Sequence, residues 1–275
     1  MPEVEPNNTL PEATGNPLQI NGDLMIQGSI TAADDPDLYQ VKLTAPTVVR
    51  FEAFTSLFGC NFLEIRLQLL NSYGFAIYDS FENSNGCSAI VAFLDEESYF
   101  IKVSSETPVA NYFLQADFQN NGGAESEPKM SKGVNDTLET ADSNLLEDNN
   151  AYVIGDHLDV DDIDVYEIQV PPLAHIRAEL IEGDRATETC ESWDIASRLT
   201  LFDQNGQVLA DDDFFGGIGR GLCSMIDGSQ GEFSYYPLAK NSTLSTQTYF
   251  LMVRSASWGF DTMRAFSYRL QVTFR

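Results

Sequence analysis

The sequence carries the same series of short motifs twice, and this repeat constrains the fold more than any other feature. Five blocks of the first half recur in the same order in the second half. The matched pairs are residues 7–13 and 135–141, 34–39 and 161–166, 66–74 and 198–206, 99–103 and 249–253, and 112–115 and 268–271. The spacing between matched blocks grows along the chain, so the second copy has longer loops. Five ordered matches predict two domains of one fold in tandem.

The matched blocks alternate apolar and polar residues, as half-buried β-strands do. The predicted apolar faces are Tyr39/Val41/Leu43, Val49/Phe51/Ala53, Ile65/Leu67/Leu69, Tyr99/Ile101/Val103 and Tyr112/Leu114/Ala116 in the first copy, with Tyr166/Ile168/Val170 in the second. Polar turn clusters at 71–74 and 203–206 separate the strands. Six or more short strands per copy, without long helical periodicity, predict an all-β protein of two tandem jelly-roll-like antiparallel β-sandwiches.

The boundary between the copies is expected where the chain becomes polar and rich in glycine. Residues 120–126 read Asn-Asn-Gly-Gly-Ala-Glu-Ser, which is typical of a short flexible linker. We therefore predict a first domain over residues 1–119, a linker over 120–126 and a second domain over 127–275. Each domain has a full set of strands, so each is expected to fold on its own.

The four cysteines follow the repeat. Cys60 and Cys87 flank the strand region 66–78 of the first copy, and Cys190 and Cys223 flank the equivalent region of the second. This placement favours the pairs Cys60–Cys87 and Cys190–Cys223 over the other two pairings, each worth about 3 to 4 kcal/mol in the chain-entropy model. An even number of cysteines without metal-site spacing fits an oxidising compartment. The chain is therefore predicted to be secreted or extracellular, at a cell surface or in a periplasm.

The charge of the chain argues against two classes of partner. Its 42 acidic and 15 basic side chains give a formal net charge of −27 at pH 7. Such a surface repels the phosphates of nucleic acids and of anionic membranes. The chain also has no run of about 18 apolar residues that would span a bilayer. We predict no nucleic-acid binding and no membrane insertion.

The sequence shows no recognisable catalytic motif. Its two histidines, His157 and His175, have no nucleophile motif nearby, so the sequence offers almost no residues from which a hydrolase triad could be built. A pair of facing carboxylates, as in glycoside hydrolases, stays open as an alternative because the chain has 42 acids. The prediction is a protein that is not an enzyme.

Oxygen-bearing side chains gather in two segments of the first copy. The candidate ligands are Glu3, Glu5, Asn7, Asn8, Ser29, Asp34 and Asp37. Alternation along an extended chain puts the first two carboxylates and the Asn7 amide on one side. Calcium takes six to eight hard oxygen ligands, and these two segments together offer such a set. The alternative is that these residues are solvated turn acids and an Asx turn before a strand.

The order of the motifs resembles a known family. An E-P-N-N-T opening, D-x-D-x-Y before a strand, R-L-x-L-x-x-x-x-G, Y-F-I-K-V and Y-x-L-Q are similar to the bacterial pre-peptidase C-terminal domain. That domain accompanies the catalytic domains of secreted peptidases and is similar in fold to the collagen-binding domains of clostridial collagenases. The resemblance implies a β-sandwich without catalytic activity and, as in the collagenase relatives, a calcium site at the N-terminal segment.

The resemblance carries the calcium site into the second copy with one departure. The ligands it implies there are Asn135, Asp136, Asp156, Asp161 and Asp164. Six extra residues, 129–134, separate Glu127 from Asn135. We expect this insertion to displace the acidic ligands of the opening segment. Calcium is accordingly expected to stabilise the first copy more than the second.

Taken together, these patterns predict a non-catalytic, calcium-stabilised accessory module of a secreted bacterial protein, associated with a peptidase. Its expected role is substrate or surface binding, or that of a spacer. The expected partners are a protein or polysaccharide surface and the catalytic domain of the parent protein. The alternatives are a purely structural extracellular repeat protein and an enzyme with an unrecognised carboxylate site.

Overall fold

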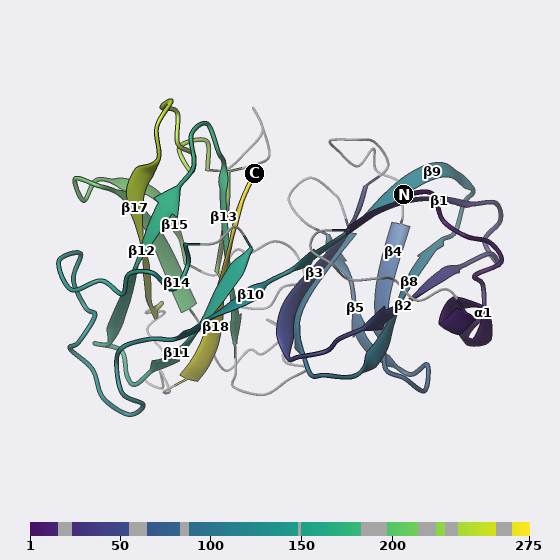
Figure 1. Ribbon diagram of the computed structural model, residues 1–275, viewed down its shortest axis with the longest axis horizontal. Helices are drawn as coiled ribbons and strands as arrows, with labels where there is room; N and C mark the ends of the chain where they lie inside the picture. Colours follow the sequence, from purple (N-terminus) through teal and green to yellow (C-terminus); the bar gives the residue numbers. More distant parts are fainter. Residues whose placement is uncertain are drawn as a thin grey trace. The chain divides into compact units, whose positions relative to one another are not determined.

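The computed structural model contains two compact units. It describes residues 1–15, 24–54, 65–82, 88–147, 150–182, 197–213, 224–228, 236–256 and 266–275. Unit 1 comprises Met1–Phe118, and the described residues from Gln119 onward belong to unit 2 (Figure 1). That each unit folds independently stays a prediction.

Unit 1 is built from two antiparallel sheets. Within its described residues the sheet orders are β1-β9-β3-β7-β6 and β2-β8-β4-β5. The elements are α1 (Leu10–Gly15), β1 (Leu24–Ile30), β2 (Asp37–Lys42), β3 (Thr47–Phe54), β4 (Ile65–Leu70), β5 (Ala76–Asp79), β6 (Phe81–Glu82), β7 (Ser88–Leu94), β8 (Ser98–Ser105) and β9 (Val109–Phe118). Non-consecutive strands are neighbours in both sheets, so the chain crosses repeatedly from one sheet to the other.

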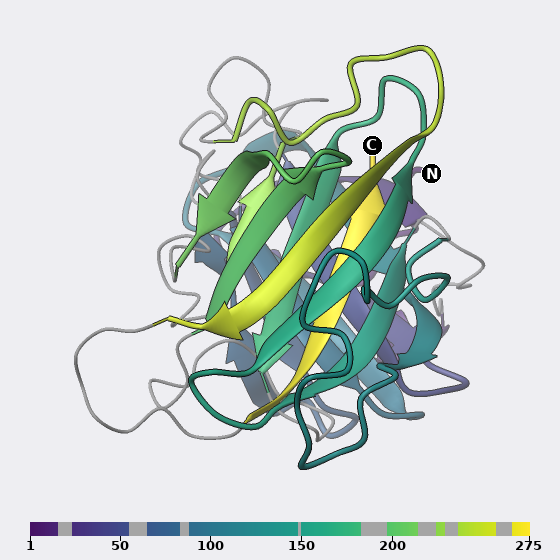
Figure 2. The same cartoon turned by 90° about the vertical axis from the view of Figure 1, so that its left-hand side faces the viewer.

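Unit 2 has the same arrangement, with an additional strand at one edge of the larger sheet and, among the described residues, no counterpart of β6 at the other edge. Its described strands form the sheets β10-β11-β18-β13-β16 and β12-β17-β14-β15, and Figure 2 looks onto the second of these. The strands are β10 (Asn120–Ala124), β11 (Ala151–His157), β12 (Ile163–Val170), β13 (Ile176–Glu182), β14 (Ser197–Asp203), β15 (Val208–Asp212), β16 (Met225–Asp227), β17 (Gln247–Ser255) and β18 (Phe266–Phe274). Strands β11, β18, β13 and β16 take the places of β1, β9, β3 and β7.

The apolar core of unit 1 lies between its two sheets. All five apolar faces predicted for the first copy belong to one cluster of buried residues, which draws on strands of both sheets. In unit 2 the side chains of Tyr166, Ile168 and Val170 are completely buried. The predicted alternation of these strands is confirmed, and so is the all-β fold of antiparallel sheets. Burial of one face per strand provides the main stabilisation of such a sandwich.

One short helix departs from the all-β pattern. At the start of α1, both the backbone N–H and the hydroxyl of Thr9 donate to Glu12 Oε2, at 2.9 and 2.7 Å. This local pairing caps the first turn and favours the helix. Leu10 and Ala13 then pack against Leu38, Leu70 and Phe100 on the outer side of the four-stranded sheet. The helix thus covers a small apolar patch of unit 1.

The predicted flexible linker is wrong for most of its length. Residues Asn120–Ala124 form β10, which pairs in parallel with β11 of unit 2. The backbone of Gly122 passes so close to the Leu145 carbonyl that a Cβ would overlap it, which explains a glycine in this strand. The physical reason for the difference is that strand pairing with β11 satisfies the backbone polar groups of this segment, whatever its side-chain composition.

The predicted disulfide bonds and the predicted absence of a membrane span also concern the fold. Cys60, Cys87, Cys190 and Cys223 all lie outside the described residues. Their pairing therefore stays a prediction. Within the described ranges, no helix has the length and apolar character needed to cross a bilayer.

Candidate metal centres

The N-terminal segment of unit 1 runs alongside β1 as an extended chain. The Glu3 N–H donates to the Gln27 carbonyl at 2.8 Å, and the Leu38 N–H donates to the Asn7 carbonyl at 2.9 Å. The segment is thereby fixed between β1 and the start of β2. Because side chains alternate along an extended chain, Glu3 and Glu5 point to the same side.

Three carboxylates meet where this segment reaches β2. The carboxylate oxygens of Glu3, Glu5 and Asp37 all lie within 4.8 Å of one another. Asp37 is fully buried, whereas Glu5 is exposed. Burial is the largest cause that raises the pKa of Asp37 to about 8; a hydrogen bond from Tyr112 opposes the shift, and the charges of Glu3, Glu5 and Asp35 add to it. None of these contributions to the pKa of Asp37 comes from a positive charge.

Two buried tyrosines support the cluster from within the sandwich. The Tyr39 hydroxyl, from the four-stranded sheet, donates to Glu3 Oε2 at 2.9 Å, and the Tyr112 hydroxyl, from β9, donates to Asp37 Oδ2 at 2.5 Å. The two hydroxyl oxygens are also in contact. A Cβ on Gly28 would overlap the phenol of Tyr112, so only glycine lets the ring reach its place.

The Asn7 side chain faces the same carboxylates. Asn7 is buried, and one terminal atom of its amide lies 3.1 Å from both Asp37 Oδ1 and Glu5 Oε2. With its nitrogen there, the amide donates to both carboxylates. With its oxygen there, the amide adds a fourth oxygen to the set, which is the orientation that a bound cation favours.

The other residues predicted in the first copy lie around this cluster. Asn8 donates to Asp35 Oδ1 at 2.7 Å, and the Ser29 N–H donates to Glu3 Oε1 at 2.8 Å. Asp34 is exposed and lies outside the group of three carboxylates. Asp35, which the sequence did not single out, adds to the negative charge around Asp37.

Unit 2 contains a second and more buried cluster. The carboxylate oxygens of Glu127, Asp162 and Asp164 lie within 4.8 Å of one another, and all three residues are buried. Burial is the largest cause that raises the pKa of Asp164 to about 9, followed by the charge of Glu125, while a hydrogen bond from Tyr268 opposes the shift. Burial likewise raises the pKa of Glu125 to about 7.

Two oxygens at this second cluster lack a hydrogen-bond partner among the described residues. They are Asn135 Oδ1 and Asp164 Oδ1, and both residues are completely buried. The amide nitrogen of Asn135 donates to Asp142 Oδ2 at 3.3 Å. An unsatisfied buried oxygen is costly, and direct coordination of a cation removes that cost.

The two clusters are built from equivalent parts. By their hydrogen bonds and, for Glu5 and Glu127, by their spacing in the sequence, the equivalent pairs are Glu3 and Glu125, Glu5 and Glu127, Asn7 and Asn135, Asp35 and Asp162, Asp37 and Asp164, Tyr39 and Tyr166, and Tyr112 and Tyr268. For example, the Val165 N–H donates to the Asn135 carbonyl at 2.9 Å, as Leu38 does to Asn7. The same backbone contacts therefore bring equivalent residues to both sites, although the three carboxylates within 4.8 Å of one another include Glu3 in unit 1 and Asp162 in unit 2.

The sequence predicted only part of the second cluster. Asp164 belongs to it, but Asp161 is 83% exposed, and Asp136 and Asp156 are engaged with Gly133 and Lys129 instead. Sequence reasoning missed Glu125 and Asp162, and it considered Glu127 only as a residue displaced by the insertion. The spacing of Glu125 and Glu127, which repeats that of Glu3 and Glu5, was the signal that could have identified both glutamates.

The six-residue insertion does not displace Glu127, contrary to our expectation. The loop turns back after Pro128, and the Val134 N–H donates to Glu127 Oε2 at 2.9 Å. The chain then continues into Asn135 at the place that Asn7 holds in unit 1. An insertion between two ligands leaves them in place when it forms a closed loop on the surface.

These clusters consist of oxygen atoms from carboxylates and amides. Hard oxygen donors of this kind are the ligands that Ca²⁺ prefers, and among the residues that the structure describes no histidine or cysteine joins either cluster. Buried carboxylates that share one small space repel one another unless a cation or protons balance their charge. The arrangement can therefore hold a divalent cation or share protons.

The raised pKa of Asp37 predicts how metal-free stability depends on pH. Its ordinary value is 3.8 and its folded value about 8. Between these values the folded state holds a proton that the unfolded state has lost. Proton binding by Asp37 therefore adds to the free energy of unfolding; this added stability is fully present below pH 4 and is lost as pH rises through 8. We expect the melting temperature in chelator to fall from pH 5 to pH 8.

Thermal melts at intervals of one pH unit check this slope, with Asp37→Asn as the control. The variant removes the titrating group, so its melting temperature is expected to depend less on pH than that of the wild type. A wild-type slope equal to that of the variant would contradict the proton-binding role of Asp37.

Comparison with known proteins gives distant structural similarities. No family model matches the chain, and no curated protein matches it. The pre-peptidase C-terminal domain of a collagenase from Bacillus anthracis is 14% identical over 36% of this chain and 91% of that chain, with a TM-score of 0.29. The STIV MCP is 8% identical over 91% of this chain and 96% of that chain, with a TM-score of 0.28. The CUB1-EGF-CUB2 domain of human MASP-1/3 is 9% identical over 92% of this chain and the whole of that chain, with a TM-score of 0.24. Since all three TM-scores lie below 0.5, what the chain does must be inferred from its own residues.

Proposed function

We propose that this chain is a non-catalytic accessory module that binds one calcium ion in each unit. The observation that carries the proposal is the cluster of Glu127, Asp162 and Asp164, three buried carboxylates within 4.8 Å of one another. Placing several anions in a buried space is strongly unfavourable without a counter-charge. A divalent cation supplies that charge and also coordinates the unpartnered oxygens of Asn135 and Asp164.

Calcium suits these sites better than other common metals. Zinc and copper favour nitrogen and sulfur ligands, and the described part of the chain brings no histidine or cysteine to either cluster. Magnesium demands near-ideal octahedral geometry and keeps several waters, whereas calcium accepts irregular sets of carboxylate and amide oxygens. Extracellular calcium modules bind in the 10⁻⁴ to 10⁻³ M range, which fits the proposed location of this protein outside a bacterial cell.

The ions would stabilise the fold rather than take part in catalysis. Each cluster joins a segment that precedes the sandwich to the first residues of a core strand, β2 or β12. In unit 2 all three carboxylates are buried. A catalytic metal needs an open coordination position that faces a substrate. This geometry supports a role in stability.

We propose surface or substrate attachment, or spacing, as the purpose of the module within a peptidase-associated secreted protein. An exposed aromatic pair supports attachment: Tyr73 and Phe75 at the β4–β5 turn are 80% and 70% exposed. Unit 2 has Asn205 and Gln207 at the matching positions. Exposed aromatic side chains are favourable contacts for a protein or polysaccharide surface. The catalytic domain of the parent protein is the other proposed partner.

A calorimetric titration tests the calcium sites. The full chain, freed of metal with a chelator, is expected to bind two calcium ions per molecule and to melt at a higher temperature in millimolar calcium. The double variant Asp34→Ala/Asp161→Ala is the matched control, because it removes two exposed acids next to the clusters, and it should still bind two ions. A wild-type chain with no binding heat and no thermal shift would refute the proposal.

A further inference from the structure

The insertion of unit 2 forms a closed loop against the second acidic cluster. In unit 1 a single residue separates Glu5 from Asn7, whereas residues 128–134 separate Glu127 from Asn135. The loop holds the Glu127 carboxylate at both oxygens, with Val134 N–H at 2.9 Å and the Ser131 hydroxyl at 3.4 Å. The Ser131 hydroxyl also lies 2.7 Å from the Pro128 carbonyl, which closes the loop on itself.

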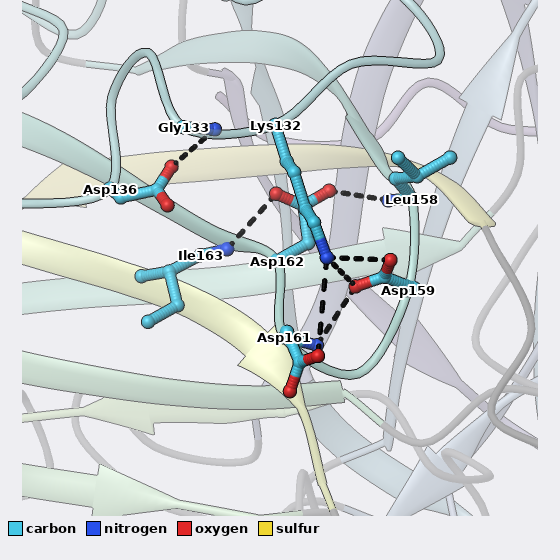
Figure 3. A network of polar contacts seen from close by, with 8 residues as sticks. All are labelled: Lys132, Gly133, Asp136, Leu158, Asp159, Asp161, Asp162 and Ile163. Carbon is cyan, nitrogen blue, oxygen red and sulfur yellow. Dashed lines mark hydrogen bonds and ion pairs between the residues drawn. The ribbon is translucent and has the colours of Figure 1, made fainter.

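Lys132 fastens this loop to the turn between β11 and β12. Its Nζ donates to Asp159 Oδ1 and Oδ2 at 2.8 and 2.7 Å and lies 4.0 Å from Asp161 Oδ2 (Figure 3). The same turn carries Asp162, whose N–H donates to the Asp159 carbonyl at 3.2 Å. The lysine therefore joins the loop that orients one carboxylate of the cluster to the turn that carries another.

A second lysine of the insertion makes a similar contact: Lys129 Nζ lies 3.4 Å from Asp156 Oδ1.

The insertion encloses its acidic cluster more than the corresponding segment of unit 1 does. Glu127 is 6% exposed, whereas its equivalent Glu5 is exposed and accepts its backbone hydrogen bond from Asn7 at 3.0 Å. No lysine lies between Glu5 and Asn7 in the sequence.

We propose that residues 129–134 are a latch that slows exchange of the cation at the second site, with Lys132 as its fastening contact. This inference rests on the proposed calcium sites. An ion can leave only when Glu127 and Asp162 separate, and the Lys132–Asp159 contact opposes that movement. The positive charge of Lys132 also repels an incoming cation. Removal of the lysine should therefore accelerate both release and uptake.

Stopped-flow release of calcium into excess fluorescent chelator tests the latch on the full chain. The wild type is expected to show two phases of equal amplitude, a fast one from unit 1 and a slow one from unit 2. Asp164→Asn should remove the slow phase and thereby assign it. Lys132→Gln should accelerate the slow phase by up to about fivefold, the upper range for a partly exposed ion pair, without changing the fast phase.

Two further variants separate the latch from general effects. Lys132→Arg keeps the charge and should keep the slow phase, while Lys42→Gln, at an exposed end of β2, should leave both phases unchanged. If two ions bind but the slow phase of Lys132→Gln equals that of the wild type, the latch is refuted and the calcium sites stand. If the wild type binds no calcium, the proposed function fails and the latch with it.

Discussion

Replacing Asp164 by Asn should have opposite effects with and without calcium. In saturating calcium the variant loses an anionic ligand, and at 100 times the dissociation constant the lost linkage is worth about 2.7 kcal/mol of unfolding free energy. In chelator at pH 7 the wild type must bind a proton on Asp164 to fold, because burial and the charge of the half-buried Glu125 raise the pKa of Asp164 to about 9; an amide removes this cost, so the variant should be as stable as the wild type or more stable. The amide can still accept the hydrogen bond from Tyr268.

Denaturant unfolding of the wild type and the variant, each in calcium and in chelator, measures this reversal. Asp161→Asn is the matched control, because it removes a neighbouring acid whose side chain is 83% exposed. It should change stability little in either condition. A destabilisation by Asp164→Asn that is equal in calcium and in chelator would show that Asp164 acts through packing or hydrogen bonding alone.

Replacing Gly155 by Ala should destabilise unit 2 strongly. Gly155 pairs with Tyr268 across β11 and β18, and an added Cβ would overlap the phenol of that fully buried tyrosine. Overpacking of this kind costs about 1–3 kcal/mol, and the displaced hydroxyl also weakens its 2.6 Å hydrogen bond to Asp164. A total of about 3 kcal/mol corresponds to a fall in melting temperature of roughly 6–12 °C.

Thermal melting and calcium titration of Gly155→Ala check this prediction together. The equivalent change in unit 1, Gly28→Ala, should act in the same way through Tyr112. Gly15→Ala at the end of α1 is the control, since an added Cβ there meets nothing within 4 Å. Full stability of Gly155→Ala would mean that Tyr268 has room to move and does not position the acidic cluster.

The strands could be predicted from the sequence because their signal is local. The alternation of Tyr39, Val41 and Leu43 specifies which side chains enter the core, whatever partner strand they meet. Strand β10 could not be predicted in this way. Its residues Asn120–Ala124 are polar or small, and they become a strand through pairing with β11, a partner about 30 residues away in the sequence.

The candidate sites show a similar limit at the level of single residues. The sequence predicts Asp34 and Asp161 as ligands, yet their neighbour Asp162 belongs to the second group of carboxylates, and their neighbour Asp35 is the acid whose charge acts on Asp37. Which of two adjacent aspartates faces inward depends on turn geometry, because the inward one accepts hydrogen bonds from the backbone of the preceding turn, as Asp35 does from Thr31 N–H at 3.0 Å. Composition alone does not contain that information.

The structure also reverses the expected order of calcium affinity of the two sites. The sequence predicts that calcium favours the first copy, because it predicts that the insertion of residues 129–134 displaces Glu127. Instead, Glu127 is buried with Asp162 and Asp164, whereas Glu5 is exposed. Charge–charge attraction is stronger where water is excluded, so the second site is now expected to hold its ion more tightly.

Strand β10 has a mechanical consequence for a protein that carries two such units. Only Gln119 separates the end of β9 from the start of β10, so tension along the chain passes from one sandwich into the next without a slack segment to extend first. The load falls on the hydrogen bonds between β10 and β11, and just beyond them on Glu125 and Glu127. An ion bound to this segment would then raise the force needed to pull β10 away from β11, by an amount that depends on the calcium concentration around the protein.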